Sequence, residues 1–219
     1  MDTPTRILTS VGRLVGLLGK ETFLDRKKNH ISLNRRSMKM SSTNKERYLT
    51  TGEDIKNLLA RCKKCNSITD GGKNIVFHAE LPNLNIAMKN KVAVIVNTAD
   101  GEQVGHWFLL TCFRNLKTAN AKCFIVDTLG QVKKEPNIMK NVKLFCRNNH
   151  FTLLNYNLKI QRSDSLACGY LVLFFLFKFS IMSLNEFLSL KRVMTRQSIN
   201  TNEKIALKAT KNHFRINSL

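Results

Sequence analysis

The middle of the chain alternates short apolar runs with polar turns, which is the pattern of β-strands. The first run, residues 92–97, is rich in β-branched side chains and predicts a buried strand. A second run covers residues 106–113, and a third covers residues 123–127. Because only short polar segments join the three runs, we expect an antiparallel meander.

Two further segments have the spacing of helices. Ile55, Leu58 and Leu59 follow a helix-start signal at residues 51–54 and indicate where the folded region begins. Residues 166–179 are apolar on nearly every side, which is typical of a helix buried on all faces. The sequence therefore predicts an α+β fold in which a central mixed or antiparallel sheet packs against a buried helix.

Composition divides the chain into three regions. Residues 1–45 are rich in Arg, Lys, Ser, Asn and Thr, and we expect them to form a basic, disordered arm. Residues 46–190 are expected to form the folded domain. Residues 191–219 are basic and only weakly periodic, and we expect either a tail or an extension of that domain.

The chain shows neither an export signal nor a membrane span. The apolar stretch from Ile7 to Leu18 is interrupted by Arg13 and is not followed by a cleavage site. The most apolar run, residues 171–177, is too short to cross a bilayer. We therefore expect an intracellular protein whose six cysteines are free thiols.

The charge of the chain indicates a polyanionic partner. Lys and Arg number 36 against 15 Asp and Glu, a formal net charge of +21. Such an excess repels itself in a compact protein, and its usual explanation is nucleic acid or an acidic membrane surface. No base-reading motif is apparent, so we expect binding to duplex DNA through its phosphates. A basic protein without such a partner is the alternative.

Two residues with complementary chemistry lie at the ends of neighbouring predicted strands. His106 opens the second strand and Asp127 closes the third. If the hairpin loop is centred near residues 116 and 117, the two fall roughly opposite each other on one face of the sheet. A carboxylate there accepts the imidazole N–H and orients the ring as a general base.

Cys168 is the candidate nucleophile. It lies in the first turn of the predicted buried helix, where the helix dipole and a nearby imidazolium favour the thiolate, and Gly169 lets another chain approach closely. Gln161 precedes Cys168 in the segment Gln161-Arg-Ser-Asp-Ser-Leu-Ala-Cys168. Its amide and the backbone N–H of Cys168 are expected to form the oxyanion hole. Either His106 or Cys168 alone would be explained as an ordinary structural residue. The hypothesis of a catalytic site rests on finding both of them together with Asp127 and Gln161.

The same set resembles the adenovirus-type cysteine proteases, the adenains, which are related to the SUMO proteases. The segment Asn97-Thr-Ala-Asp-Gly-Glu-Gln-Val-Gly-His106-Trp107 is similar to the histidine segment of that family. Phe124-Ile-Val-Asp127-Thr-Leu-Gly130 resembles its acidic strand end, and the spacing from Gln161 to Cys168-Gly169 also matches. The similarity covers roughly residues 52–179.

The resemblance implies a circularly rearranged papain-like fold and cleavage after glycine in a narrow channel. It implies that Trp107 forms a wall of that channel, with Gly169 also at the substrate, and that Gln161 is the oxyanion donor. It further implies DNA as an activating polyanion and an activating peptide joined by a disulfide. The cysteine for that disulfide does not carry over, because His150 occupies the ungapped position and Cys146 only lies near it.

The functional hypothesis is a DNA-associated endopeptidase that matures precursor proteins of a virus or mobile element, in the virion or the host nucleus. The alternatives are an isopeptidase acting on ubiquitin-like modifiers and an inactive, basic DNA-packaging protein. No cofactor is needed for the chemistry. Cys62-Lys-Lys-Cys65 has half of a zinc-site spacing, but no second pair follows, so no metal site is predicted.

Overall fold

The computed structural model describes residues 51–99, 105–115, 120–194 and 196–215. The expected arm, residues 1–45, lies outside the described residues. The described part is α+β. Its elements are α2 (Gly52–Leu59), α3 (Lys63–Ile68), β1 (Ile75–Phe77), η3 (His78–Asn83), β2 (Lys91–Asn97), β3 (Trp107–Asn115), β4 (Asn120–Asp127), η4 (Val132–Lys134), α4 (Pro136–Asn148), β5 (Thr152–Asn157), α5 (Cys168–Ile181), α6 (Leu184–Met194) and α7 (Ile199–Phe214).

Five strands form one mixed sheet in the order β1-β2-β3-β4-β5. The predicted meander is present, because β2 pairs antiparallel with β3 and β3 antiparallel with β4. Strands β1 and β5 are added in parallel at the two edges. The predicted helix start is also present, since Thr51 and Asp54 form reciprocal side-chain to backbone hydrogen bonds at the first turn of α2.

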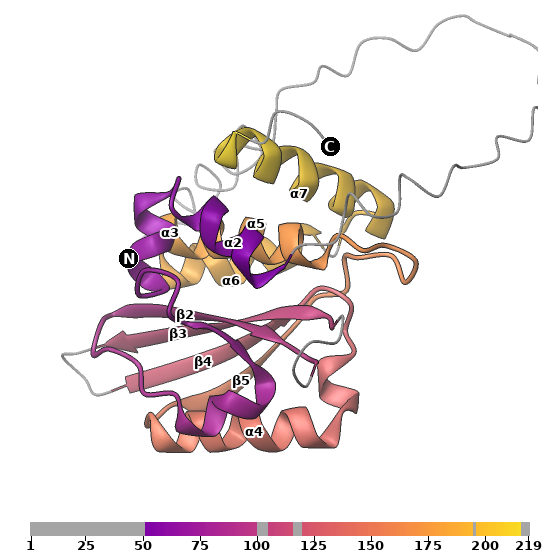
Figure 1. Cartoon of the computed structure of the whole chain (residues 1–219). Helices are drawn as coiled ribbons and strands as arrows, with labels where there is room; N and C mark the ends of the chain where they lie inside the picture. Colours follow the sequence, from indigo (N-terminus) through magenta and orange to yellow (C-terminus); the bar gives the residue numbers. More distant parts are fainter. Residues whose placement is uncertain (1–50, 100–104, 116–119, 195, 216–219) are drawn as a thin grey trace, which may run out of the picture. The chain divides into compact units, whose positions relative to one another are not determined.

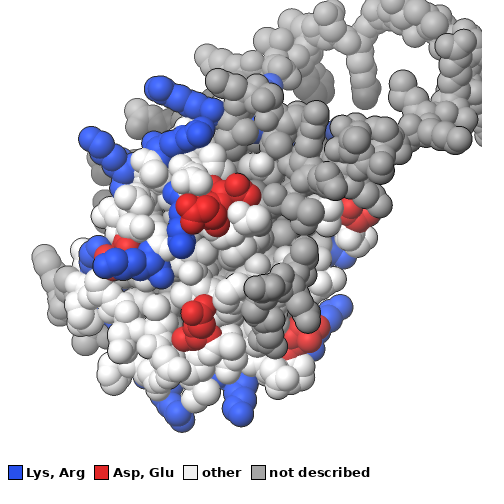
Figure 2. All heavy atoms as spheres, in the orientation of Figure 1, with Lys and Arg blue, Asp and Glu red and all other residues white. Residues whose placement is uncertain are grey.

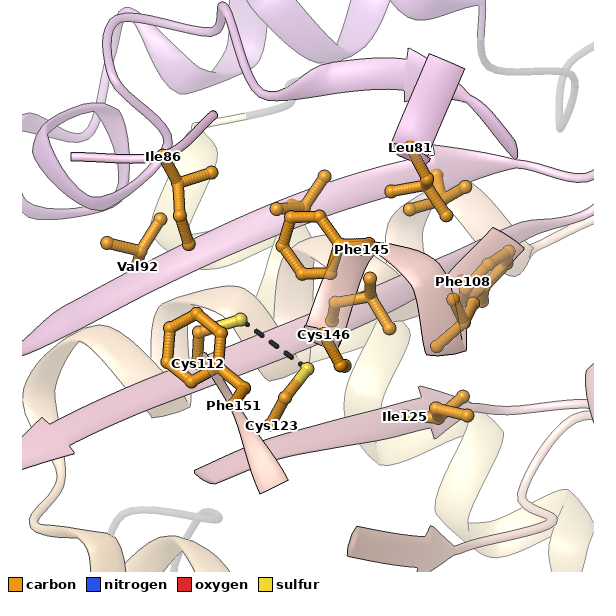
Figure 3. Packing of buried hydrophobic residues seen from close by; sticks show 14 of the residues in the cluster. Leu81, Ile86, Val92, Phe108, Cys112, Cys123, Ile125, Phe145, Cys146 and Phe151 are labelled. Atoms are coloured by element: carbon orange, nitrogen blue, oxygen red, sulfur yellow. Dashed lines mark hydrogen bonds between the residues drawn. The ribbon is translucent and has the colours of Figure 1, made fainter. Parts of the chain in front are cut away.

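Helices cover both faces of the sheet (Figure 1). Helix α4 lies on one face and buries the stripe Ile138, Val142, Phe145 and Cys146, whose spacing is that of an amphipathic helix. Between α4 and the sheet lies a hydrophobic cluster that includes Phe108 of β3 (Figure 3). Helix α5 lies on the opposite face with the other helices around it.

Helix α5 is buried on nearly every side, as its sequence predicts. Every residue from Gly169 to Leu176 is buried. The helix packs on β2 and β3 and is itself covered by α3, α6 and α7. Because α5 has a sheet on one side and helices on the other, no face of it needs to be polar. The first residue of this helix is Cys168, so the central layer of the fold holds the candidate nucleophile.

The segment after residue 190 contains ordered secondary structure. Ser198 caps the start of helix α7, because its hydroxyl accepts a hydrogen bond from the Thr201 N–H, and the helix ends at Phe214. It packs along α5, and the Thr210 hydroxyl donates to the Tyr170 carbonyl oxygen at 3.1 Å. The C-terminal region thus contributes to the support of the nucleophile helix.

Candidate active site

The backbone of His106 is held by the end of β2. The Thr98 hydroxyl accepts a hydrogen bond from the His106 N–H at 2.8 Å, and the Thr98 N–H donates to the His106 carbonyl at 2.9 Å. Asn97 stabilises this turn, because its Oδ1 accepts from the Ala99 N–H at 2.8 Å. These bonds give a physical reason for the sequence Asn97-Thr98-Ala99 in front of the histidine.

Gly105 allows the chain to pass this turn. A Cβ atom at Gly105 would lie 1.9 Å from Asn97 Oδ1 and 2.5 Å from the Ala99 nitrogen. Any side chain here would have to displace backbone and not merely a mobile side-chain end. Glycine is therefore required by the close approach of two chain segments beside His106.

Asp127 holds the imidazole in place. Its Oδ1 lies 2.8 Å from His106 Nε2 and also accepts from the Leu129 N–H at 3.0 Å. Its Oδ2 accepts from the Val132 N–H at 2.8 Å. Both backbone donors belong to the turn after β4, which Gly130 closes with φ at +75°. Two backbone N–H groups thus orient the carboxylate toward the ring.

The predicted pairing of His106 with Asp127 is correct, but the two residues are diagonal and not opposite. Asn115 pairs with Asn120, so the hairpin is centred one residue later than we assumed. Extending the register from the pair Leu109 and Val126 places Phe108 opposite Asp127. A shift of the centre by one residue changes the register by two, and an even change keeps the same face. The imidazole spans the remaining distance.

His106 also contacts Cys168, so the ring lies between a carboxylate and a thiol. The ring and the thiol are close enough for each to shift the pKa of the other. Since Nε2 is engaged by Asp127, Nδ1 is the ring nitrogen left for the sulfur. The His106 side chain is only 13% exposed, and Cys168 is half-buried. This arrangement allows proton transfer between sulfur and nitrogen while the carboxylate holds the ring.

The charges in this group favour the ion pair. Burial opposes a charge on His106, but hydrogen bonds to Asp127 and Cys168 outweigh it and raise the pKa of His106 to about 9. Burial likewise opposes ionisation of Cys168. The imidazole and the N–H groups of Trp107 and Gly169 outweigh it and hold the pKa of Cys168 below its usual value. Burial would raise the pKa of Asp127, but the imidazole and two backbone N–H groups lower it. The directions of these three shifts all favour the state with thiolate, imidazolium and carboxylate.

Gln161 is buried and firmly held beside the acidic strand end. Its Oε1 accepts from the Thr128 hydroxyl at 2.8 Å, and its Nε2 donates to the Ser165 carbonyl oxygen at 2.7 Å. Its backbone N–H donates to the Thr128 carbonyl oxygen at 3.0 Å. Thr128 directly follows Asp127, so one chain segment orients both the acid and the amide. The amide has a second N–H hydrogen beyond the one used by Ser165.

The loop before Cys168 is supported by two residues that were not predicted from the sequence. One is Thr128. The other is Glu203 of α7, a buried carboxylate whose Oε1 accepts from the Ser165 hydroxyl at 2.6 Å and whose Oε2 accepts from the Arg162 N–H at 2.8 Å. Glu203 lies in residues 191–219, which the sequence suggests to be a basic tail or an extension of the domain. The one sequence signal for its role is an isolated acidic residue in a lysine-rich segment.

The two residues expected at the substrate channel flank the thiol. Trp107 is buried, and a Cβ atom on Gly52 would lie 3.7 Å from its Cη2 atom, so the start of α2 covers the indole. Gly169 is buried as well and contributes its N–H to the Cys168 sulfur. The structure thus brings His106, Asp127 and Cys168 together, with Trp107 and Gly169 as direct neighbours of the sulfur.

The other cysteines and histidines have different surroundings. Cys112, Cys123 and Cys146 are buried in the core between the sheet and α4, as expected for ordinary core positions. Among the described residues, the group of side chains able to ligate a metal ion is Cys62, Cys65 and His213. None of the catalytic candidates belongs to that group.

Comparison with known proteins identifies no relative. No protein-family model matches the chain, and none of the curated proteins is similar enough to count as a match. Within the described ranges, none of the helices has the length and apolar character needed to cross a bilayer. The chemistry of the site therefore rests on its own geometry.

Proposed function

We propose that the chain is a cysteine endopeptidase of the adenain type. The observation that carries this proposal is the position of the His106 ring, hydrogen-bonded to the Asp127 carboxylate and close to the Cys168 thiol. The mixed sheet with a buried helix that begins at the nucleophile is compatible with that family's papain-related fold. The proposed substrate is a precursor protein cut after glycine.

The proposed reaction has two steps. The Cys168 thiolate attacks the carbonyl carbon of the scissile bond, and the His106 imidazolium gives its proton to the leaving amine. A water molecule then attacks the thioester, His106 removes a proton from that water, and the thiol is released. The oxyanion is stabilised by the Cys168 N–H, which has no acceptor within the helix, and by the second N–H of Gln161.

The test is cleavage of peptides that carry Gly-Gly before the scissile bond. The wild-type chain is expected to cut them, and Cys168→Ala to be inactive while it keeps its circular dichroism spectrum. Cys146→Ala is the matched control, because it removes a thiol from the core and is expected to leave activity unchanged. Activity in Cys168→Ala would end the proposal. Ubiquitin-like conjugates assayed in parallel distinguish an isopeptidase from an endopeptidase.

We further propose that duplex DNA binds this enzyme through basic side chains, including a cluster on α4. Lys140, Lys143 and Arg147 of α4, together with Lys133 of η4, line a hollow of about 810 Å³. Basic side chains lie along the lower edge of the face in Figure 2, where α4 runs in Figure 1. Burial and, after it, the charge of Lys191 on α6 lower the pKa of Lys133.

Salt-dependent binding tests this second proposal. Each neutralised phosphate contributes about −0.9 to the slope of log affinity against log salt concentration. Reversing two charges, in Lys140→Glu with Lys143→Glu, is expected to flatten the slope by about two such contributions. Binding that does not change with salt would contradict the proposal and leave the protease assignment intact. Cleavage measured in the same titration determines whether DNA activates the enzyme.

A further inference from the structure

A second group of reactive side chains lies where α3, α5 and α7 meet. Cys62 and Cys65 are buried, at the beginning of α3, and His213 comes from the last turn of α7. Their ligand atoms all lie within 4.8 Å of one another. Two soft sulfur donors and one imidazole nitrogen, gathered from distant parts of the chain, form the donor set that zinc prefers.

Independent contacts hold this group together. Arg61 donates from Nη1 to the Phe214 carbonyl oxygen at 3.3 Å and to the Arg215 carbonyl oxygen at 3.4 Å. Since Arg61 precedes Cys62 and Phe214 follows His213, this side chain brings the two ligand segments side by side. The ring of Phe177 from α5 stacks on the His213 ring with centroids 3.5 Å apart. The imidazole is therefore oriented before any metal binds.

The three ligand atoms lie slightly too close together to hold a metal ion and would have to move apart by a small amount. Cys62 Sγ lies 3.3 Å from His213 Nε2 and 2.6 Å from Cys65 Sγ. Zn–S bonds of about 2.3 Å in tetrahedral geometry separate two sulfurs by about 3.8 Å, so the thiols must separate by about 1 Å. A disulfide is the competing fate of the two sulfurs. A disulfide would involve only the two sulfurs. The presence of His213 as a third possible ligand therefore favours a metal ion over a disulfide.

A hollow adjoins the site at His213. His213 lines it together with Arg61, Asn212 and Arg215, and its volume is about 800 Å³. This hollow provides an entry path for the ion and room for a water molecule or a small anion as fourth ligand. The two arginines favour an anion there, because a zinc ion with two thiolates and a neutral imidazole carries no net charge of its own.

We propose that Cys62, Cys65 and His213 bind one zinc ion, which fastens the C-terminal helix α7 to α3. On binding, both thiols lose their protons to solvent and the sulfurs form bonds to the metal, while His213 binds through its Nε2 lone pair. The site is distinct from the candidate active site, so its test does not depend on the proposed function. The inactive Cys168→Ala chain is expected to bind zinc as well as the wild type.

The experiment measures metal bound to the full chain. After purification with zinc present and passage over a weak chelating resin, the wild type is expected to retain about one zinc per chain. Cys62→Ser, Cys65→Ser and His213→Asn are expected to lose it, whereas Cys146→Ser retains it. Cobalt added to the metal-free wild type is expected to give a thiolate-to-metal absorption band and tetrahedral d–d bands.

Three results would overturn the proposal. The first is a wild-type chain that holds no zinc and gives no thiolate band with cobalt. The second is full zinc retention in His213→Asn, which would remove the third ligand. The third is an intact mass lower by two hydrogens together with no metal, which would identify a Cys62–Cys65 disulfide. If the cysteine variants fail to fold, the cobalt spectrum of the wild type still decides.

Discussion

Apart from Cys62 and Cys65, the thiols of this molecule lie in two regions, and their chemistry is opposite. Between the sheet and α4, Cys123 lies close to Cys112, with the two sulfurs 3.4 Å apart, and to Cys146 (Figure 3). Hydrogen bonding to Cys112 and burial raise the pKa of Cys123, and hydrogen bonding to Cys123 and burial raise that of Cys146. At the end of the sheet, Cys168 is also largely enclosed, yet its pKa is lowered.

The difference in thiol pKa between the two regions comes from the groups around each sulfur and not from how deeply each sulfur is buried. The core thiols have other thiols and apolar side chains around them, so a negative charge there has no counter-charge. Cys168 has an imidazole held by Asp127 and two backbone N–H groups. A cysteine in a folded protein becomes a nucleophile when positive charge and donors surround it, and burial alone makes it inert.

Removing the imidazole should make Cys168 resemble the core thiols. We expect His106→Ala to lower the hydrolysis rate by a factor on the order of 10⁴ or more, because members of such a catalytic group act as a unit. Alkylation of Cys168 at neutral pH should slow at the same time. Peptide cleavage and iodoacetamide labelling measure the two effects. Fast labelling in His106→Ala would show that the imidazole does not set the reactivity.

Gln161→Ala should reduce the cleavage rate by about 10²–10³, the usual loss for one oxyanion donor. Thr128→Val provides the comparison. It keeps the amide but removes the hydroxyl that bonds Gln161 Oε1, so we expect a smaller loss. Steady-state kinetics on both variants measures the effects. Equal losses would mean that the amide serves only to position the loop.

Gly105→Ala should reduce activity by about 10², because it moves the histidine backbone away from the thiol. The reason is the 1.9 Å approach of the added Cβ to Asn97 Oδ1. Gly52→Ala is the matched control, since its Cβ would meet Trp107 at an ordinary contact distance of 3.7 Å. Kinetics and thermal unfolding of the two variants check this. A fully active Gly105→Ala enzyme would contradict the close approach.

The pH profile should be bell-shaped. Activity rises as Cys168 loses its proton, which happens below the usual thiol pKa, and falls as His106 loses its proton near pH 9. Asp127→Asn removes the negative charge that helps to raise the pKa of His106, so the alkaline limb should move to lower pH. Rates measured across the pH range test the direction of that shift. An unmoved alkaline limb would assign it to another group.

Cys146→Ala should leave the rate constants unchanged and lower the free energy of unfolding by about 1–3 kcal/mol, because it opens a small cavity in the core. Urea denaturation measures the loss, and the cleavage assay checks the rate. A large fall in activity would show that the two thiol regions are coupled, and the comparison drawn above would fail.

The sequence predicted the parts of the fold that local patterns determine. The meander and the buried helix follow from runs of apolar residues, and the approach of His106 to Asp127 follows from strand ends that meet. The diagonal register could not be predicted, because it depends on how the four residues between Asn115 and Asn120 turn. Edge strands β1 and β5 pair in parallel with distant segments, and no local signal specifies such pairing.

Helix α7 was missed for a different reason. Its buried face consists of Asn202, Glu203, Ala206, Thr210 and Phe214, which have helical spacing but are mostly polar. Their partners belong to other elements: Asn202 donates to the Met194 carbonyl oxygen and Thr210 to that of Tyr170. A pattern of apolar positions cannot indicate a face that is buried through hydrogen bonds. The approach of His213 to Cys62 was unpredictable for the same reason.

The support that Glu203 gives to the loop before Cys168 has a consequence for synthesis. Cys168 leaves the ribosome before Glu203, because the carboxylate lies 35 residues later in the chain. The loop residues Arg162 and Ser165 can therefore gain their carboxylate partner only after α7 has been translated and has docked. In the proposed protease, the order of translation therefore leaves the loop in front of the candidate nucleophile without this carboxylate until α7 has been made.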